Sequence, residues 1–176
     1  MEKHVVYTDG TRRLMVDTPF GVAALLYDPE PFVIREVLLP RISPEDQPER
    51  AMALPEDADP PAGAAETARA LRRYFDGLPV PVPDCLDLGG LSELQTRVLE
   101  AVVAIPYGQT RSYGEIAAAA GRPGAARFVG ACMARNRFPV FVPCHRVVRA
   151  DGGLGGFGGG LDLKRRMLDL EAGAAG

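Results

Sequence analysis

Residues 112–135 read SYGEIAAAAGRPGAARFVGACMAR, and this stretch decides what kind of domain surrounds it. Ser112 followed three residues later by Glu115 is a capping box, which predicts a short helix over residues 113–120. The Gly-Arg-Pro that follows breaks this helix and favours a second one over residues 124–135. Two short helices joined in this way are typical of a helix-turn-helix, although any other corner between two helices has the same pattern.

The charge around this stretch differs from that of the whole chain. The 176 residues carry a net charge of −3, yet residues 101–150 hold seven arginines against the single acid Glu115, a net charge of +6. Residues 1–100 carry a net charge of −8. A basic block within an acidic protein is typical of a surface that binds a polyanion. The alternative is a solvated arginine-rich face.

The first part of the chain has the pattern of a small sheet. Short apolar and β-branched runs bounded by turn residues predict antiparallel strands over residues 15–17, 21–27 and 32–39. Residues 40–63 contain six prolines and several acids, which predicts a mobile loop. Residues 64–75 then predict a helix that ends before a run of prolines.

A proline-rich segment over residues 78–90 separates a first part with strand patterns from a second part with short helical patterns. We therefore expect a small α/β domain over residues 1–77, a linker over residues 78–90, and a mainly α domain over residues 91–176. A second capping box, from Ser92 to Gln95, opens the first helix of that second domain.

Three further segments follow the helix-turn-helix. The apolar run over residues 139–143 is bounded by prolines and predicts a short strand. Residues 152–160 hold seven glycines in nine positions, which predicts a hairpin or wing. A phosphate-binding loop is the alternative, but the lysine and the strand-to-helix frame of such a loop are absent. Residues 161–171 predict a closing helix.

Cys144 and His145 follow the predicted strand directly. A single cysteine is most often a small buried apolar residue. Here the neighbouring Arg137, Arg146 and Arg149 would favour the thiolate, which is the nucleophilic form. Adjacent residues of an extended chain point to opposite sides, which disfavours the direct dyad of a cysteine hydrolase and favours a proton relay through a water.

Composition excludes several classes of protein. No apolar run approaches the roughly 18–20 residues that cross a bilayer, and the first residues lack a signal-peptide core, so we expect a cytoplasmic protein. Three cysteines without a close pair argue against a disulfide framework, and the missing Cys-x-x-Cys and His-x-x-x-His spacings argue against zinc. We expect no metal and no cofactor. Arginine supplies 18 of the 20 basic residues, which suggests a GC-rich prokaryotic gene.

Together these motifs resemble the O6-alkylguanine-DNA alkyltransferase family over residues 91–171. The resemblance rests on Pro143-Cys-His-Arg-Val147, preceded by the helix-turn-helix and followed by glycine-rich sequence and a leucine-rich helix. Further matching positions are Ile105-Pro-Tyr-Gly108, Ser112-Tyr-Gly-Glu-Ile-Ala117, Ala125-Ala-Arg-Phe-Val-Gly130, Asn136, Gly159-Gly-Leu161, Lys164 and Leu170-Glu171. The family implies a ribonuclease-H-like α/β domain, with which residues 1–77 are compatible, followed by a winged helix-turn-helix domain.

The resemblance implies a role for each residue of a catalytic group. Cys144 would accept the alkyl group from guanine O6 in a single turnover, without a cofactor. His145 would take the thiol proton through a water, and Glu171 would orient the imidazole. Asn136 would hold the turn before the cysteine. The alternative for Glu171 is a solvated helix terminus, but a carboxylate near the C-terminal end of a helix is unfavourable, which favours a functional reason for it.

The resemblance also implies the partner, which is double-stranded DNA carrying O6-alkylguanine, with O4-alkylthymine as a further substrate. A monomer at the nucleoid would bind the minor groove, Arg127 would fill the gap left by the flipped nucleotide, and Tyr113 would press on its backbone. The other DNA contacts would be Gly114, Arg122, Ala126, Gly130 and Ala131. The base pocket would consist of Tyr113, Met133, Val147, Phe157 and Gly158.

Two pocket positions depart from the family pattern, in which a hydroxylated aromatic residue and then a serine are common. Phe157 and Gly158 stand there, so neither side chain can donate a hydrogen bond, and the smaller Gly158 leaves room for larger O6 groups. An alternative function is a lesion-binding or signalling protein without transferase activity. The presence of Cys144, His145 and Glu171 disfavours it. A transcriptional regulator is disfavoured because residues 1–90 carry no effector or dimerisation motif.

Overall fold

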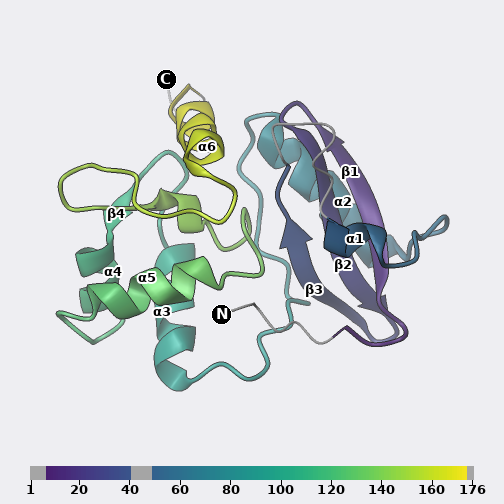
Figure 1. Ribbon diagram of the computed structural model, residues 1–176, viewed down its shortest axis with the longest axis horizontal. Helices are drawn as coiled ribbons and strands as arrows, with labels where there is room; N and C mark the ends of the chain where they lie inside the picture. Colours follow the sequence, from purple (N-terminus) through teal and green to yellow (C-terminus); the bar gives the residue numbers. More distant parts are fainter. Residues whose placement is uncertain (1–6, 41–48, 174–176) are drawn as a thin grey trace. The chain divides into compact units, whose positions relative to one another are not determined.

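A computed structural model describes residues 7–40 and 49–173, and the chain forms two compact units that divide between Asp87 and Leu88. The division falls within residues 78–90. The first unit contains a three-stranded antiparallel sheet in the order β1-β2-β3, as Figure 1 shows. Its strands are β1 (Arg12–Thr18), β2 (Gly21–Pro29) and β3 (Phe32–Leu38). The three predicted strands are confirmed, and β1 and β2 are longer than predicted.

The turn between β1 and β2 has a local cause. Thr18 Oγ1 donates a hydrogen bond to the Gly21 carbonyl at 2.6 Å, and it accepts one from the Phe20 amide. Gly21 has a φ of 109°, a conformation that glycine adopts without a Cβ clash. The turn sets the register in which Thr18 pairs with Gly21 and Val16 with Ala23.

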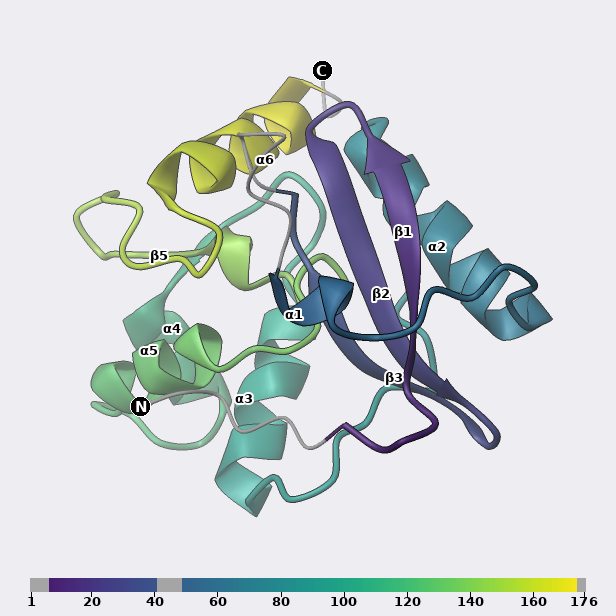
Figure 2. The same cartoon turned by 45° about the vertical axis from the view of Figure 1, so that its right-hand side comes forward.

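Two helices cover the sheet. Residues 23–28 of β2 are all buried, and because alternate side chains point to opposite faces, both faces of β2 must be covered. Figure 2 shows α2 (Ala62–Phe75) and the short α1 (Glu49–Met52) on opposite faces. Ala51 of α1 packs with Ala24 and Leu26.

The structure corrects the prediction that residues 40–63 form a loop throughout. Residues 41–48 lie outside the described part of the chain. Of the remainder, α1 is helical, Glu56 forms an isolated parallel bridge with Arg13, and α2 begins at Ala62. The Arg13 side chain also bonds Glu56 at 3.0 Å, which fixes the segment after α1 to β1.

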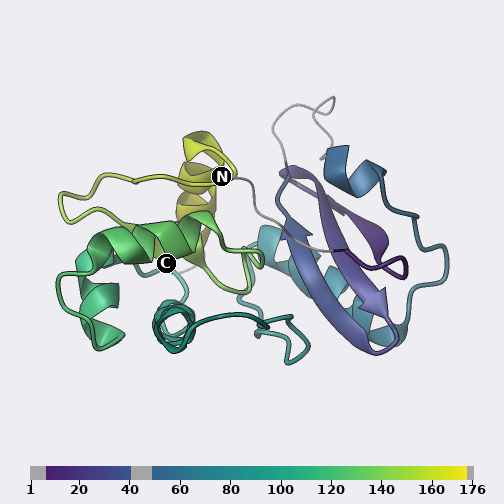
Figure 3. The same ribbon diagram turned by 60° about the horizontal axis from the view of Figure 1, so that its bottom comes forward.

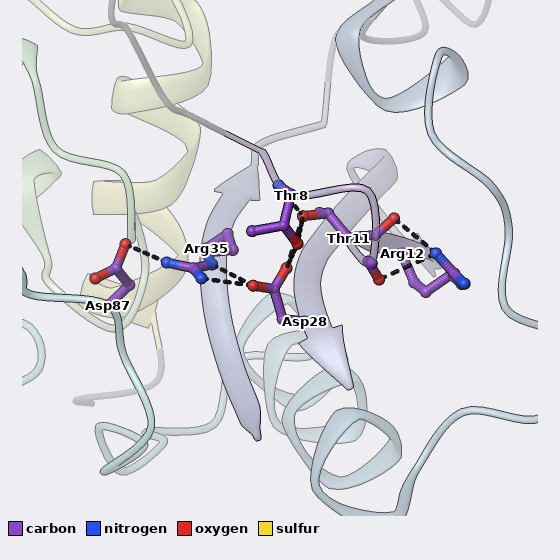
Figure 4. A network of polar contacts seen from close by, with 7 residues as sticks. Thr8, Thr11, Arg12, Asp28, Arg35 and Asp87 are labelled. Atoms are coloured by element: carbon purple, nitrogen blue, oxygen red, sulfur yellow. Dashed lines mark hydrogen bonds and ion pairs between the residues drawn. The ribbon is translucent and has the colours of Figure 1, made fainter. Parts of the chain in front are cut away.

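A buried carboxylate organises the polar side of this unit (Figure 4). Asp28 accepts two hydrogen bonds from Arg35, at 2.8 and 2.5 Å, and one from Thr11 at 2.6 Å. Burial alone would raise the pKa of Asp28, but these hydrogen bonds outweigh it and lower the pKa. Arg35 also pairs with Asp87 at 3.0 Å. The pair holds the end of the first unit beside β3, where Ile34 exchanges backbone hydrogen bonds with residues 85 and 87.

The second unit is mainly helical. Its first three helices are α3 (Glu93–Val103), α4 (Tyr113–Ala119) and α5 (Ala126–Ala134), and they pack against one another. Both predicted capping boxes are present, at Ser92 and at Ser112. Figure 3 views α3 nearly end-on while α5 lies lengthwise, so these two helices cross steeply.

The rest of the second unit contains the main departures from prediction. Residues 139–143 form no strand: they turn, and Val140 has a φ of 76°. Cys144–Arg146 form a 3-10 helix, η1, before β5 (Val147–Val148), which pairs in parallel with β4 (Arg111–Ser112). The glycine-rich residues 152–160 form an irregular loop without strands of their own. The closing helix is confirmed as α6 (Leu161–Gly173).

Across the described ranges, 7–40 and 49–173, no helix combines the length and the apolar character needed to cross a membrane.

Candidate active site and nucleic-acid interface

Cys144 lies at the start of η1 and is 6% exposed. Its amide donates a hydrogen bond to the Val142 carbonyl at 2.8 Å. Because η1 has about three residues per turn, Cys144 and His145 do not alternate as they would on an extended chain. The expectation that the two residues follow one another on an extended strand was therefore wrong, because the Arg146 amide donates to the Pro143 carbonyl at 2.9 Å and closes the turn of η1.

Glu171 is the centre of the buried polar group. One carboxylate oxygen lies 2.6 Å from His145 Nε2, and the Gly108 amide donates to the other at 2.9 Å. Arg146 donates to both oxygens, with Nε 2.9 Å from Oε2 and Nη2 3.1 Å from Oε1. Glu171 is 1% exposed, so the alternative of a solvated helix terminus is wrong. Four donors compensate the unfavourable position of this carboxylate near the end of α6.

These contacts set the protonation of the pair. Burial would raise the pKa of Glu171, but the hydrogen bonds from His145 and Arg146 lower it to about 2. An ionised carboxylate only accepts hydrogen bonds, so Nε2 of His145 carries the hydrogen and Nδ1 carries the lone pair of the neutral ring. Complete burial lowers the pKa of His145 and outweighs the Glu171 carboxylate, which raises it, while the positive charges of Arg146 and Lys164 lower it further. The result is a neutral imidazole whose Nδ1 can act as a base.

Arg146 was expected to contribute to the basic environment of the thiol, and the structure gives it a different role. Besides Glu171, it donates to the Ile105 carbonyl at 2.8 Å and lies over the Tyr107 ring at 5.4 Å. It is 8% exposed. Arg146 is therefore a buried residue that binds Glu171 and the 105–108 segment. It does not contribute to the basic surface, although it is one of the seven arginines of the basic block.

The cation beside Cys144 is Lys164, which sequence reasoning noted only as a matching position. Its ammonium donates to the Val147 carbonyl at 2.6 Å and also to the Leu154 carbonyl, and it lies 5.9 Å from the centre of the Phe157 ring. Burial lowers the pKa of Lys164 to about 8, and a thiolate at Cys144 raises it. By the same coupling, the charge of Lys164 favours the Cys144 thiolate. The sequence contains one sign that could have pointed to Lys164: it is one of two lysines in a chain whose other basic residues are arginines.

Asn136 bridges the turn that leads to Cys144. Its side-chain amide donates to the Val142 carbonyl at 2.8 Å, and its carbonyl oxygen accepts from the Phe138 amide at 3.0 Å. The residue is 7% exposed. Both bonds cross residues 136–142, where Val140 has a positive φ, so one side chain satisfies the backbone of an irregular buried segment.

The second unit also has a cavity of about 540 Å³, and Cys144, His145, Glu171 and Asn136 are not part of its lining. Six of the expected site residues line it together with Ala134 and Gly156: Tyr113, Ala126, Arg127, Gly130, Phe157 and Gly158. The other expected residues lie outside the lining. Met133 and Val147 are buried in the core, and Gly114, Arg122 and Ala131 lie elsewhere on α4, α5 and the turn between them.

Tyr113 connects the cavity with Cys144. It is the first residue of α4, so the capping box at Ser112 fixes where its side chain starts. A Cβ added at Gly155 would lie 2.7 Å from the Tyr113 hydroxyl, and one added at Gly130 would lie 3.9 Å from the ring. Burial raises the pKa of Tyr113, and negative charge on Cys144 raises it further. The phenol therefore stays protonated and can donate a hydrogen bond next to the thiol.

The surface beside the cavity is basic. Three arginines are exposed here: Arg127 on α5, Arg122 in the turn before it and Arg135 directly after it. The sequence contains no acid between Glu115 and Asp151. A buried cysteine with a histidine–glutamate pair, a neighbouring ammonium and an arginine-rich helix defines a cysteine-dependent site next to a polyanion-binding surface.

Comparisons with known proteins show to which family of cysteine-dependent, DNA-binding proteins the chain is similar. Residues 93–173 match the family model described as 6-O-methylguanine DNA methyltransferase, DNA binding domain. A methylated-DNA–protein-cysteine methyltransferase of Mycobacterium leprae is 48% identical over 125 residues, which cover 71% of this chain and 73% of the relative. The protein of that name from Methanothermobacter thermautotrophicus is 43% identical over 116 residues, and the alignment covers 65% of each chain, slightly less than two thirds of the relative.

A solved structure agrees along nearly the whole length. The Mycobacterium tuberculosis OGT in complex with DNA has a TM-score of 0.73 and 37% identity, with 93% of this chain and 94% of that chain covered. The chain belongs to the methylated-DNA–protein-cysteine methyltransferase family, which confirms the resemblance drawn from its motifs.

Proposed function

We propose that the protein repairs DNA by direct reversal, transferring the alkyl group of O6-alkylguanine irreversibly to Cys144, once per molecule. The observations that carry this proposal are that Cys144 is electrostatically coupled to Lys164 and Tyr113 and directly precedes His145 of the buried His145–Glu171 pair. Tyr113 also lines a cavity together with Arg127. The names of the relatives support the same reaction. O4-alkylthymine is proposed as a second substrate.

The reaction follows from the protonation of the site. Nδ1 of neutral His145 takes the thiol proton through a water, and Glu171 stabilises the imidazolium that forms. The thiolate electron pair makes the new sulfur–carbon bond while the carbon–O6 bond breaks. The released electron pair stays on the purine, which takes up the proton that the thiol lost, so atoms and charges balance without a cofactor. Tyr113 is placed to donate a hydrogen bond to the departing base.

The lesion must leave the duplex to reach this cavity, at a cost of roughly a few kcal/mol. In the proposed complex α4 and α5 act as a helix-turn-helix with the loop of residues 152–160 as its wing, and α5 enters the minor groove. The guanidinium of Arg127 takes the place of the extruded base. The M. tuberculosis OGT bound to DNA supports the choice of partner.

The remaining parts of the proposal concern organisation. The first unit takes the role of the ribonuclease-H-like domain of the family, followed by a linker over residues 78–90 and the alkyltransferase domain over residues 91–176. The protein acts as a monomer at the nucleoid of a prokaryotic cell. Its affinity for DNA depends strongly on salt, because arginine–phosphate contacts release counterions.

Mass spectrometry of the intact protein tests the reaction. After incubation with duplex DNA carrying one O6-methylguanine, the wild-type chain gains one methylene, and peptide mapping places it on Cys144. Cys144→Ser gains nothing but still binds DNA, while Cys85→Ser and Cys132→Ser are modified like the wild type. A protein that binds the lesion and never gains mass is a lesion-binding protein instead, and modification of Cys85 or Cys132 contradicts the assignment of the nucleophile.

A further inference from the structure

Phe128 is an apolar side chain that α5 does not bury. The inner face of the helix consists of Val129, Cys132 and Met133, all buried, whereas Phe128 is 37% exposed. It follows Arg127 directly, so the two side chains leave the helix about 100° apart. Arg127 lines the cavity and Phe128 does not. The ring therefore faces solvent on the side of α5 that turns away from the base pocket.

The surroundings of Phe128 indicate what covers it. Arg127 on the same helix, Arg122 in the turn before it and Arg135 directly after it are exposed, and no acid lies between Glu115 and Asp151 in the sequence. An exposed aromatic ring within a field of one positive sign complements a polyanion with apolar surface between its charges. Duplex DNA has this composition, because base pairs and sugars lie between its phosphates. An acidic protein would also complement the positive charge, but it would not explain why an exposed aromatic ring stands next to Arg127.

We propose that Phe128 is a second DNA-inserting side chain, which wedges against the base-pair step beside the one that Arg127 enters. This inference rests on the proposed function and adds a residue to its flipping step. Apolar wedges in the minor groove partly unstack a base step and open the duplex. With Phe128 holding the neighbouring step open, less free energy is needed to extrude the damaged nucleotide, so the wedge speeds reaction on duplex DNA and has no part in the chemistry at Cys144.

The test compares Phe128→Ala with the wild type under single-turnover conditions on three substrates. On duplex DNA with O6-methylguanine opposite cytosine, Phe128→Ala reacts about tenfold more slowly, which corresponds to about 1.4 kcal/mol. On the same duplex with an abasic site opposite the lesion, the loss is less than about threefold, because the pair to be opened is already weak. On free O6-benzylguanine, which needs no flipping, the two rates agree.

Two further variants and one spectroscopic measurement sharpen this test. Phe128→Leu retains an apolar wedge and recovers most of the duplex rate. Val103→Ala removes an equally exposed apolar side chain on α3, which is 38% exposed, and leaves all three rates unchanged. With Cys144→Ser as the background, 2-aminopurine placed next to the lesion brightens on binding, and Phe128→Ala removes most of that increase.

The outcomes separate this inference from the proposed function. If the wild type never methylates Cys144, the proposed function fails and the wedge fails with it. If the wild type reacts while Phe128→Ala keeps its duplex rate, or loses rate equally on the free base, only the wedge is wrong. Sedimentation velocity tests whether a second copy of the chain, and not DNA, buries Phe128. Concentration-dependent self-association that Phe128→Ala abolishes would show that it does, and the wedge would be wrong.

Discussion

The ring of Tyr113 lies against the backbone of Gly155, so closely that a Cβ at position 155 would be 2.7 Å from the phenol oxygen. Gly155 also has a φ of +68°, which L side chains rarely adopt. The glycine-rich loop thus meets the first residue of α4 at the wall of the cavity. Its conformation decides where Tyr113 stands relative to Cys144.

Gly155→Ala is therefore expected to displace Tyr113 and to slow the reaction with free O6-benzylguanine by about tenfold or more, with a loss of stability of about 1–3 kcal/mol. Gly152→Ala is the matched control, because Gly152 has a φ of +82° but no atom within 4 Å of an added Cβ. Gly152→Ala therefore introduces the same kind of backbone strain as Gly155→Ala but does not displace the Tyr113 ring. Equal reaction rates for the two variants would show that the contact with Tyr113 does not matter.

Arg127→Ala is expected to slow repair of duplex DNA by about tenfold or more while leaving the reaction with free O6-benzylguanine nearly unchanged. The reason is that only the duplex needs a group to fill the gap in the stack. Arg122→Ala removes an exposed arginine outside the cavity lining, and it should weaken binding of damaged and undamaged DNA alike. Equal losses of Arg127→Ala on both substrates would exclude the gap-filling role.

The buried His145–Glu171 pair predicts how stability depends on pH. Folding lowers the pKa of both groups, so the unfolded chain binds more protons than the folded one in acid. The free energy of unfolding should fall as the pH drops below about 6.5, where His145 of the unfolded chain takes up a proton. It should fall further from about pH 4.5 towards pH 2, where Glu171 contributes.

Urea unfolding between pH 8 and pH 3 measures this dependence. Glu171→Gln should lose about 3–5 kcal/mol at pH 7, because it leaves Arg146 buried without its counter-ion. Asp162→Asn, an exposed acid in the first turn of the same helix, serves as the control and should lose no more than about 1 kcal/mol. A wild type that is more stable at pH 5 than at pH 7 would mean that folding raises, and does not lower, the pKa of His145.

Turnover is expected to stop at one lesion per protein molecule. A thioether on Cys144 cannot undergo thiol–disulfide exchange, so no thiol regenerates the cysteine. Quenched-flow measurements should show a burst equal to the protein concentration and no steady state. Repair of several lesions per molecule would disprove the stoichiometric mechanism.

The spent protein should melt at a lower temperature than the unreacted one. Cys144 is 6% exposed, and an added methyl group crowds a packed site at a cost of about 1–3 kcal/mol. Differential scanning calorimetry of the methylated and unmethylated chains measures the difference. Cys144→Ala, incubated with the same DNA, controls for effects of DNA on the melting temperature.

Features that depend on neighbours in the sequence were predictable from the sequence. The capping boxes at Ser112 and Ser92 pair atoms three residues apart, and the turn before Gly21 pairs Thr18 with a residue three positions on. Such contacts form wherever the pattern occurs, so β1 to β3 and the helices α2 to α6 could be predicted from it, whereas α1, β4, β5 and η1 could not. The family motifs likewise name Cys144 without knowledge of the fold.

What surrounds Cys144 depends on the tertiary structure, because its partners come from distant segments. Glu171 meets Arg146 across 25 positions and Gly108 across 63, and Lys164 reaches the Val147 carbonyl across 17. The turn at residues 139–143 read as a strand because apolar residues suit a buried strand and a buried turn equally. Asn136 satisfies part of that backbone from outside the run, and the Val142 amide closes the turn by donating to the Phe138 carbonyl. The sequence alone thus determined the main helices and strands and named Cys144 as the proposed nucleophile, whereas packing decided which charges are buried and paired around it.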